Sequence, residues 1–259
     1  MIFAHREGCL LRSLLITFLL LCGMYSSLAQ AEIWSRTAIS GMKDVAVAPD
    51  GIIWLTDKNG AVWKSDNIYA SSLTQIETSG FSRISVGPDG VVWAVKSNGT
   101  LWKFATDSWS ETAAKEIEDV AIALDSKKVW VVRKNGTIWF SSDQGQRFMQ
   151  IEGSDFSRIS VKSENMVWAV KSDGTLWNLA AGNWNKTAAN GIEDIAIAPN
   201  GLIWFSGKDG TVSSSSDDGI TFILYEEVGG LKNIDARNRG AWVVSFDGTL
   251  WHKFFSPQF

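Results

Sequence analysis

Short apolar runs built around a tryptophan recur six times along the 259-residue chain, at intervals of 36 to 39 residues. In residues 91–95, Val-Val-Trp-Ala-Val, both alternating faces are apolar and β-branched residues are frequent. This pattern predicts a strand that is covered on both sides. The tryptophans of the six runs are Trp54, Trp93, Trp130, Trp168, Trp204 and Trp242. A period near forty residues indicates a protein built from repeated units.

Polar residues between the runs predict turns at matching places in every unit. An Asn-Gly or Asp-Gly pair follows each of these tryptophans by five residues. Both residues of such a pair adopt positive φ readily, so we expect a tight hairpin there. A second tryptophan lies in the returning strand of five units, whereas Ser213 takes its place in the fifth.

Each unit contains two further strand candidates. An upstream strand such as residues 83–86 is followed by a Pro-Asp-Gly turn, and a weaker strand such as residues 148–151 ends a unit. No helical periodicity is evident. Four short antiparallel strands in each of six units predict an all-β fold, a six-bladed β-propeller with four-stranded antiparallel blades.

The units alternate, which indicates three copies of a two-blade module. Trp34, Trp109 and Trp184 lie 75 residues apart, and the segment 81–86 returns unchanged as residues 156–161. The strand that carries Trp109 follows the second tryptophan of its unit by seven residues, but the chain ends eight residues after Trp251. The matching sequence lies at the other end, in residues 32–35. We therefore expect the N-terminal strand to complete the last blade and to close the ring, which removes an open sheet edge.

Residues 1–31 have the features of a cleavable secretory signal. Arg6 and Arg12 precede the apolar stretch 14–22, and small residues follow it up to Ala29 and Ala31, either of which fits a cleavage site. The stretch is too short for a good membrane span. We expect a single propeller domain over residues 32–259, exported to the periplasm or to the medium.

The composition narrows the possible functions. Both cysteines, Cys9 and Cys22, lie in the predicted signal, so the mature chain has no thiol for disulfides, metal binding or catalysis. Removal of the signal changes the formal charge from −4 to −5. A mildly acidic, mixed surface argues against a nucleic-acid partner, which needs a clustered basic face. The oligomeric state is left open, and a monomer is compatible with these features.

Two segments resemble Asp-boxes, the hairpin turns found in many propellers. They are residues 141–148 and 215–222, and residues 65–67 form a degraded version in the first unit. The Asp side chain is expected to accept backbone N–H groups and the glycine to take the positive-φ corner. We interpret the motif as a folding device remote from any site.

Catalytic residues are difficult to find in this chain. A glycosidase needs two carboxyl groups with different roles, or a tyrosine nucleophile in sialidases. Asp119 and Asp194 follow the repeat rather than break it, and His252 takes a strand position that Lys103 and Asn178 hold in other units. No metal-ligand cluster is evident. We expect neither an enzyme nor a cofactor or metal.

Candidate binding residues come from two groups. Trp34, Trp109 and Trp184 have polar neighbours in sequence, so we expect half-exposed indoles able to stack on a sugar ring. Recurrent cations of the even units suit anionic sugars or phosphate, namely Arg83, Arg158, Lys96 and Lys171. The alternative for the cations is solvation or pairing with Glu118 or Glu193. Three modules would give up to three similar pockets, hence high avidity from weak single sites.

Residues 91–102, and likewise residues 167–177, resemble the tectonin repeat. The resemblance extends over essentially all of residues 32–259. This family includes a horseshoe-crab lectin that binds lipopolysaccharide, fish-egg lectins and fungal tectonins. The resemblance implies a propeller fold and a non-catalytic, multivalent, secreted lectin for glycans or lipopolysaccharide on cell surfaces. The alternative is a protein-interaction propeller, a scaffold or assembly factor in an extracytoplasmic compartment, since the repeat also resembles photosystem-assembly propellers.

Overall fold

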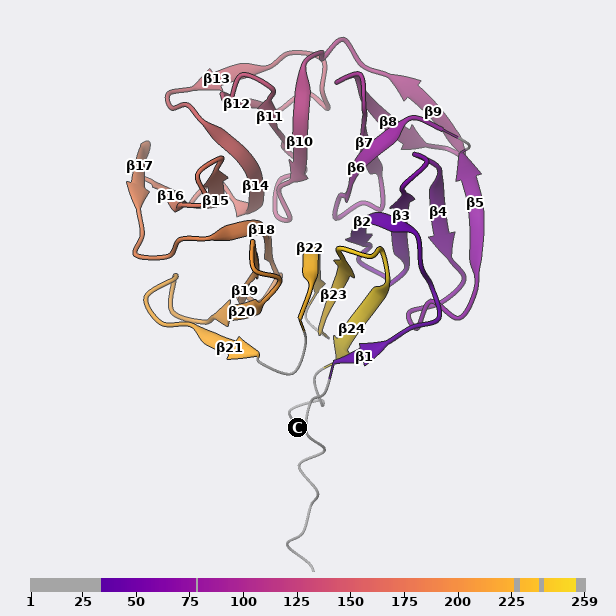
Figure 1. Ribbon diagram of the computed structural model, residues 1–259. Helices are drawn as coiled ribbons and strands as arrows, with labels where there is room; N and C mark the ends of the chain where they lie inside the picture. Colours follow the sequence, from indigo (N-terminus) through magenta and orange to yellow (C-terminus); the bar gives the residue numbers. More distant parts are fainter. Residues whose placement is uncertain (1–33, 78, 226–228, 238–239, 255–259) are drawn as a thin grey trace, which may run out of the picture.

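Six four-stranded antiparallel sheets form the blades of a closed ring (Figure 1). This computed structural model describes residues 34–77, 79–225, 229–237 and 240–254. The predicted signal peptide and both cysteines lie outside this range. No helix in the described part of the chain is long and apolar enough to cross a membrane. The six-bladed propeller expected from the repeats is confirmed.

The blades take their strands in chain order, except the sixth. Blade 1 contains β2 (Met42–Val47), β3 (Ile53–Asp57), β4 (Val62–Ser65) and β5 (Leu73–Glu77). Blade 2 contains β6 (Phe81–Val86), β7 (Val92–Lys96), β8 (Leu101–Ala105) and β9 (Ser108–Glu111). Blade 3 contains β10 (Ile117–Ile122), β11 (Val129–Arg133), β12 (Ile138–Ser141) and β13 (Met149–Ile151). Blade 4 contains β14 (Phe156–Ser163), β15 (Met166–Lys171), β16 (Leu176–Ala180) and β17 (Asn183–Lys186). Blade 5 contains β18 (Ile192–Ile197), β19 (Ile203–Gly207), β20 (Val212–Ser215) and β21 (Ile223–Tyr225). Blade 6 contains β22 (Leu231–Arg237), β23 (Gly240–Ser245), β24 (Leu250–Phe254) and β1 (Ser35–Arg36).

Strands from both ends of the chain close the ring in blade 6. Ser35 lies opposite His252 and Arg36 lies opposite Trp251 in an antiparallel pair. The indigo strand β1 lies beside the yellow strand β24 in Figure 1. Two further backbone bonds continue the pairing, from Thr37 N to the Leu250 carbonyl (3.0 Å) and from Leu250 N to Ile39 O (3.0 Å). The predicted closure is confirmed, and the expected residues 32–33 of this strand lie outside the described range.

Apolar cores lie between neighbouring blades. One of them brings Trp54 and Ala46 of blade 1 against Phe81, Ile84 and Val92 of blade 2. The six first tryptophans are at most 5% exposed. A strand with this core on one side and the next core on the other is apolar on both faces. The first tryptophans are therefore core residues, and the described ring leaves them little contact with solvent.

The Asn/Asp-Gly hairpins differ from the expected two-residue turns. Gly99 N donates to Lys96 O (2.7 Å) and Lys96 N donates to Thr100 O (2.9 Å), which makes a three-residue loop. Gly99 has a φ of +85°, but Asn98 is not among the residues with positive φ. Instead the Asn98 side chain accepts the Thr100 N–H (3.0 Å). Because this side-chain bond stabilises a right-handed turn residue, only the glycine has to adopt positive φ.

The two Asp-boxes form the expected turns. In the first, the Asp143 carboxylate accepts the Arg147 N–H (2.9 Å), and Ser141 Oγ accepts the Gly145 N–H (2.9 Å). Gly145 has a φ of +83°, and a Cβ added there would lie 2.9 Å from the ring of Trp93 in the preceding blade. The turn therefore also contributes to the contact between blades.

Candidate functional site

Three aspartates on the ring axis connect the blades of each module. Asp44, Asp119 and Asp194 take the same place in the inner strands β2, β10 and β18, and all three are buried. Their carboxylates accept the backbone N–H groups of the next inner strand. The acceptors and donors are Asp44 and Ile84 (2.9 Å), Asp119 and Ile159 (3.0 Å), and Asp194 and Ile234 (3.1 Å). Each odd blade is thus bonded to the even blade that follows it.

One guanidinium, that of Arg83 in β6, joins the three carboxylates. Its Nε lies 2.9 Å from Asp119, its Nη1 3.1 Å from Asp44 and its Nη2 3.3 Å from Asp194. Burial raises the pKa of Asp44 to about 6, against the opposing effect of Arg83. Burial also raises the pKa of Asp194. Burial alone would lower the pKa of Arg83, but the three carboxylates outweigh it and raise that pKa. Arg83 therefore stays charged and forms a structural cluster on the axis.

The equivalent positions in the other even blades differ. Arg158 in β14 lies 3.7 Å from Asp194 and 3.9 Å from Glu118, and its Nη1 donates to Ser157 O (2.7 Å). Asn233 in β22 donates its amide N–H to the carbonyl of Lys43. The axis therefore has approximate threefold symmetry in its carboxylates but not in its cations.

A polar funnel of about 330 Å³ lies at the mouth of the ring formed by the β3–β4, β7–β8, β11–β12 and β23–β24 loops. Seven of its lining residues are cationic, namely Lys43, Lys58, Arg83, Lys96, Lys134, Arg158 and Lys232, and Glu118 is the one carboxylate among them. Arg83 pairs with its aspartates, Arg158 lies near Glu118 and Asp194, and Lys232 lies 3.8 Å from Glu193. The other lysines therefore supply most of the uncompensated positive charge, namely Lys43, Lys58, Lys96 and Lys134. Walls of one sign around a concave site concentrate the field and attract anions. This basic funnel contrasts with the acidic chain around it.

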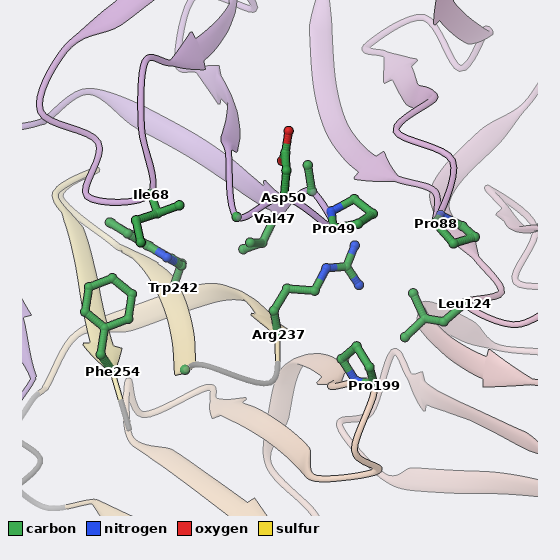
Figure 2. A pocket seen from close by; sticks show the side chains of 13 residues that line it. Val47, Pro49, Asp50, Ile68, Pro88, Leu124, Pro199, Arg237, Trp242 and Phe254 are labelled. Carbon is green, nitrogen blue, oxygen red and sulfur yellow. The ribbon is translucent and has the colours of Figure 1, made fainter. Parts of the chain in front are cut away.

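The opposite mouth is apolar. It holds a cavity of about 410 Å³ bordered by Pro49, Pro88, Leu124 and Pro199 from the loops of four blades. Figure 2 shows the Arg237 guanidinium extending between these residues. Nη2 of Arg237 donates to Val86 O (3.1 Å), and its Nε has no partner in the described structure. The two mouths thus differ in chemistry, and the basic one matches an anionic ligand better because it carries many cations.

The tryptophans expected to stack on sugars are covered by other side chains. Trp34 is only 4% exposed and meets Trp204 edge-on at 6.1 Å, so the expectation of an exposed indole is wrong for this residue. Trp109 and Trp184 are half-buried, with ring centroids 4.6 Å from Phe81 and 4.5 Å from Phe156. All three indole nitrogens are buried and have no hydrogen-bond partner among the residues that the structure describes. The polar neighbours face outward while the indoles turn inward, because adjacent strand residues point to opposite faces.

The predicted cations fall into different surroundings. Arg83, Arg158 and Lys96 meet in the funnel, whereas Lys171 is not among its lining residues. Lys96 also lies 4.2 Å from the Trp102 ring centroid, and Lys171 lies 4.6 Å from that of Trp177. The sequence also allowed these cations to pair with Glu118 or Glu193. Arg158 does lie within ion-pair distance of Glu118, whereas Arg83 pairs with aspartates instead.

Sequence reasoning missed most of the funnel lysines. Lys58 and Lys134 each directly precede the Asn-Gly pair of an odd blade, as Lys208 precedes Asp-Gly in the fifth. These three positions repeat with the same two-blade period as Arg83 and Arg158. That period was the available signal, because residues with the same place in successive modules lie around one axis.

Among the described residues, few side chains could act in acid–base catalysis or bind a metal ion. His252 lies 4.8 Å from Trp242 and 4.4 Å from Phe254, and burial lowers the pKa of its imidazole. No group of three or more His, Cys, Asp or Glu side chains is arranged there to hold a metal ion. The axial carboxylates are occupied by Arg83 and by backbone N–H groups.

Comparisons with known proteins agree with this architecture. No curated protein matches the chain. YCF48, solved bound to a D1 peptide, is 12% identical with a TM-score of 0.63, and the match covers 86% of this chain and 97% of that one. A gluconolactonase from Xanthomonas campestris is 10% identical (TM-score 0.69; 85% and 88% covered), and virginiamycin B lyase from Staphylococcus aureus is 11% identical (TM-score 0.60; 86% and 100%). At these identities the likeness shows the fold alone. The Tectonin domain model matches residues 27–245, and the chain belongs to the tectonin family.

Proposed function

We propose that the protein is an exported, non-catalytic carbohydrate-binding protein that holds anionic surface glycans, such as phosphorylated lipopolysaccharide, in the basic funnel. The observation that carries the proposal is the gathering of Lys43, Lys58, Lys96, Lys134 and Lys232 at one mouth of an acidic ring. Ammonium groups and Arg158 bind phosphate and carboxylate oxygens through charge-assisted hydrogen bonds. Family membership supports a lectin-like role.

This proposal has a single axial funnel in place of the three similar pockets expected from the three modules. The indoles of Trp109 and Trp184 pack on phenylalanines, so the lysines rather than stacked tryptophans supply the affinity. Lys58 and Lys134 stand on loops of blades 1 and 3, so one ligand with several charges can contact both. A polyphosphorylated or acidic glycan therefore fits better than a neutral monosaccharide.

Retention on a lipopolysaccharide-coated sensor tests the proposal. The double variant Lys58→Ser, Lys134→Ser removes two funnel charges and is expected to weaken retention about tenfold or more. Lys64→Ser, Lys186→Ser is the matched control, because it removes the same charge from exposed residues of β4 and β17 outside the funnel lining. The proposal fails if both double variants are retained like the wild type, or lose retention equally.

The same sensor separates the lectin from an extracytoplasmic protein-interaction scaffold. We keep this scaffold as the second candidate because YCF48, which shares the fold, was solved with a bound peptide. A lectin is displaced from the surface by soluble phosphorylated oligosaccharide. A scaffold is not retained in the first place.

A further inference from the structure

Blade 5 lacks two side chains that form one structural unit in blades 2, 3 and 4. In blades 2, 3 and 4 a cation lies over the ring of the second tryptophan, at 4.2 Å for Lys96 on Trp102, 4.0 Å for Arg133 on Trp139 and 4.6 Å for Lys171 on Trp177. In blade 5 the same two positions hold Gly207 and Ser213. Both the ring and the group above it are therefore missing.

The hydrogen-bond acceptor for the missing ring is still present. In blades 2, 3 and 4 the indole N–H donates to a threonine Oγ1, from Trp102 to Thr100 (2.8 Å), from Trp139 to Thr137 (2.9 Å) and from Trp177 to Thr175 (2.9 Å). In blade 1 the Trp63 N–H donates to Asp57 instead (3.0 Å). Thr211 takes this place in blade 5. Its hydroxyl donates to Asp209 (2.7 Å), as that of Thr100 donates to Asn98 (2.8 Å). The Thr211 oxygen is thus oriented to accept a ring N–H that blade 5 does not contain.

A cavity of about 390 Å³ lies at this place, lined by Gly207, Thr211 and Ser213. Two aromatic rings form its apolar wall. Phe205, which pairs with Ser213 across the strands, is 1% exposed, and Phe222 meets it edge-on at 5.5 Å and is 38% exposed. The site is concave, with an apolar side and a polar side. Asn190, Lys208 and Asp209 lie on the polar side with Thr211 and Ser213. Such a mixture of an aromatic wall and a few placed polar groups is typical of sites for small molecules.

We propose that blade 5 binds a planar heteroaromatic molecule with a ring N–H, of which indole is the simplest, in the place that tryptophan fills in the neighbouring blades. The ring packs on the half-exposed Phe222 beside the buried Phe205, and its N–H donates to Thr211 Oγ1. Ser213 provides no ring to fill the slot. Gly207 provides no side chain, and the Asp209 carboxylate and the Thr211 hydroxyl lie close to the place where its Cβ would be. This site is separate from the basic funnel and does not depend on the glycan proposal.

Ligand-observed fluorine NMR with 5-fluoroindole tests the proposal, because the probe signal is distinct from the many tryptophans of the chain. 5-Fluoro-1-methylindole, which lacks the N–H, is expected to bind about fivefold or more weakly. Ser213→Trp refills the slot and abolishes binding of both probes. Thr211→Val keeps the side-chain shape but removes the acceptor, so it equalises the two affinities.

Thr175→Val is the matched control, since Trp177 already occupies that acceptor and probe binding is expected to stay at the wild-type value. Thermal melting of each variant verifies folding, and Thr211→Val decides the question if Ser213→Trp does not fold. The proposal is overturned if 5-fluoroindole does not bind the wild type. It is equally overturned if Ser213→Trp binds it unchanged, or if the N-methyl probe binds wild type as well as the parent.

Discussion

Replacing Arg83 by methionine removes the charge that holds three buried carboxylates together. The Arg83 side chain is 10% exposed, and those of Asp44, Asp119 and Asp194 are 6–7% exposed. Removing one partner of a buried ion pair costs about 3–5 kcal/mol, because the remaining charge is left uncompensated. Each carboxylate keeps one backbone N–H donor in the variant. We therefore expect the free energy of unfolding to fall by an amount near this range, rather than by three times as much.

The loss should depend on pH in a defined direction. Without Arg83 the pKa values of Asp44 and Asp194 rise further, so the folded variant binds more protons than the unfolded chain between about pH 5 and pH 8. Stability then falls as the pH rises through this window. We expect the variant to differ less from the wild type at pH 5 than at pH 8.

Urea unfolding followed by tryptophan fluorescence measures both effects. Arg147→Met is the matched control, because Arg147 also pairs with an aspartate, Asp143 at 2.8 Å, but its side chain is 89% exposed. Exposed ion pairs contribute little to stability, so the free energy of unfolding of this variant should be close to that of the wild type at both pH values. A loss below about 1 kcal/mol for Arg83→Met at pH 8, or an equal loss at pH 5 and pH 8, refutes the role given to the cluster.

Three further predictions follow from the fold. Deleting residues 32–36 removes β1 and should lower the thermal unfolding midpoint by at least about 5 °C; an unchanged midpoint contradicts ring closure. Because burial raises the pKa of Asp44 to about 6, wild-type stability should fall by up to about 3 kcal/mol as the pH rises from 4 to above 6. Asp44→Asn should remove most of this pH dependence of the unfolding free energy, as measured by urea titrations. An unaltered pH dependence would mean that another group causes it. Gly145→Ala should lower the free energy of unfolding by about 1–3 kcal/mol more than Gly182→Ala does. Both glycines have positive φ, but only a Cβ at position 145 meets Trp93. Equal melting curves for the two variants would refute the importance of this contact.

The ring itself is readable from the sequence because every unit repeats the same strand and turn pattern. The displaced strand at residues 32–35 identifies the closure, since its counterparts around Trp109 and Trp184 show what the last blade lacks. The hairpin geometry was not accessible in the same way. An Asn-Gly pair is compatible with two loop lengths, and the Asn side-chain bond to Thr selects the longer one.

The site depends on contacts that only the closed ring creates. Trp109 and Trp184 have polar neighbours in sequence, but Phe81 and Phe156 cover their rings from distant positions in the chain. Arg83 reads as a solvent-exposed cation, yet the ring brings carboxylates from three modules to it. The sequence does contain the positions that line the funnel, but their convergence follows from the symmetry of the blades.

Calorimetric titration with a phosphorylated lipopolysaccharide core oligosaccharide, and with its dephosphorylated form, tests most directly whether the basic funnel binds anionic glycans. We predict that the phosphorylated form binds about tenfold tighter or more, and that raising the salt from about 0.05 M to about 0.5 M removes most of this preference. Equal affinity for the two forms at low salt would contradict the account.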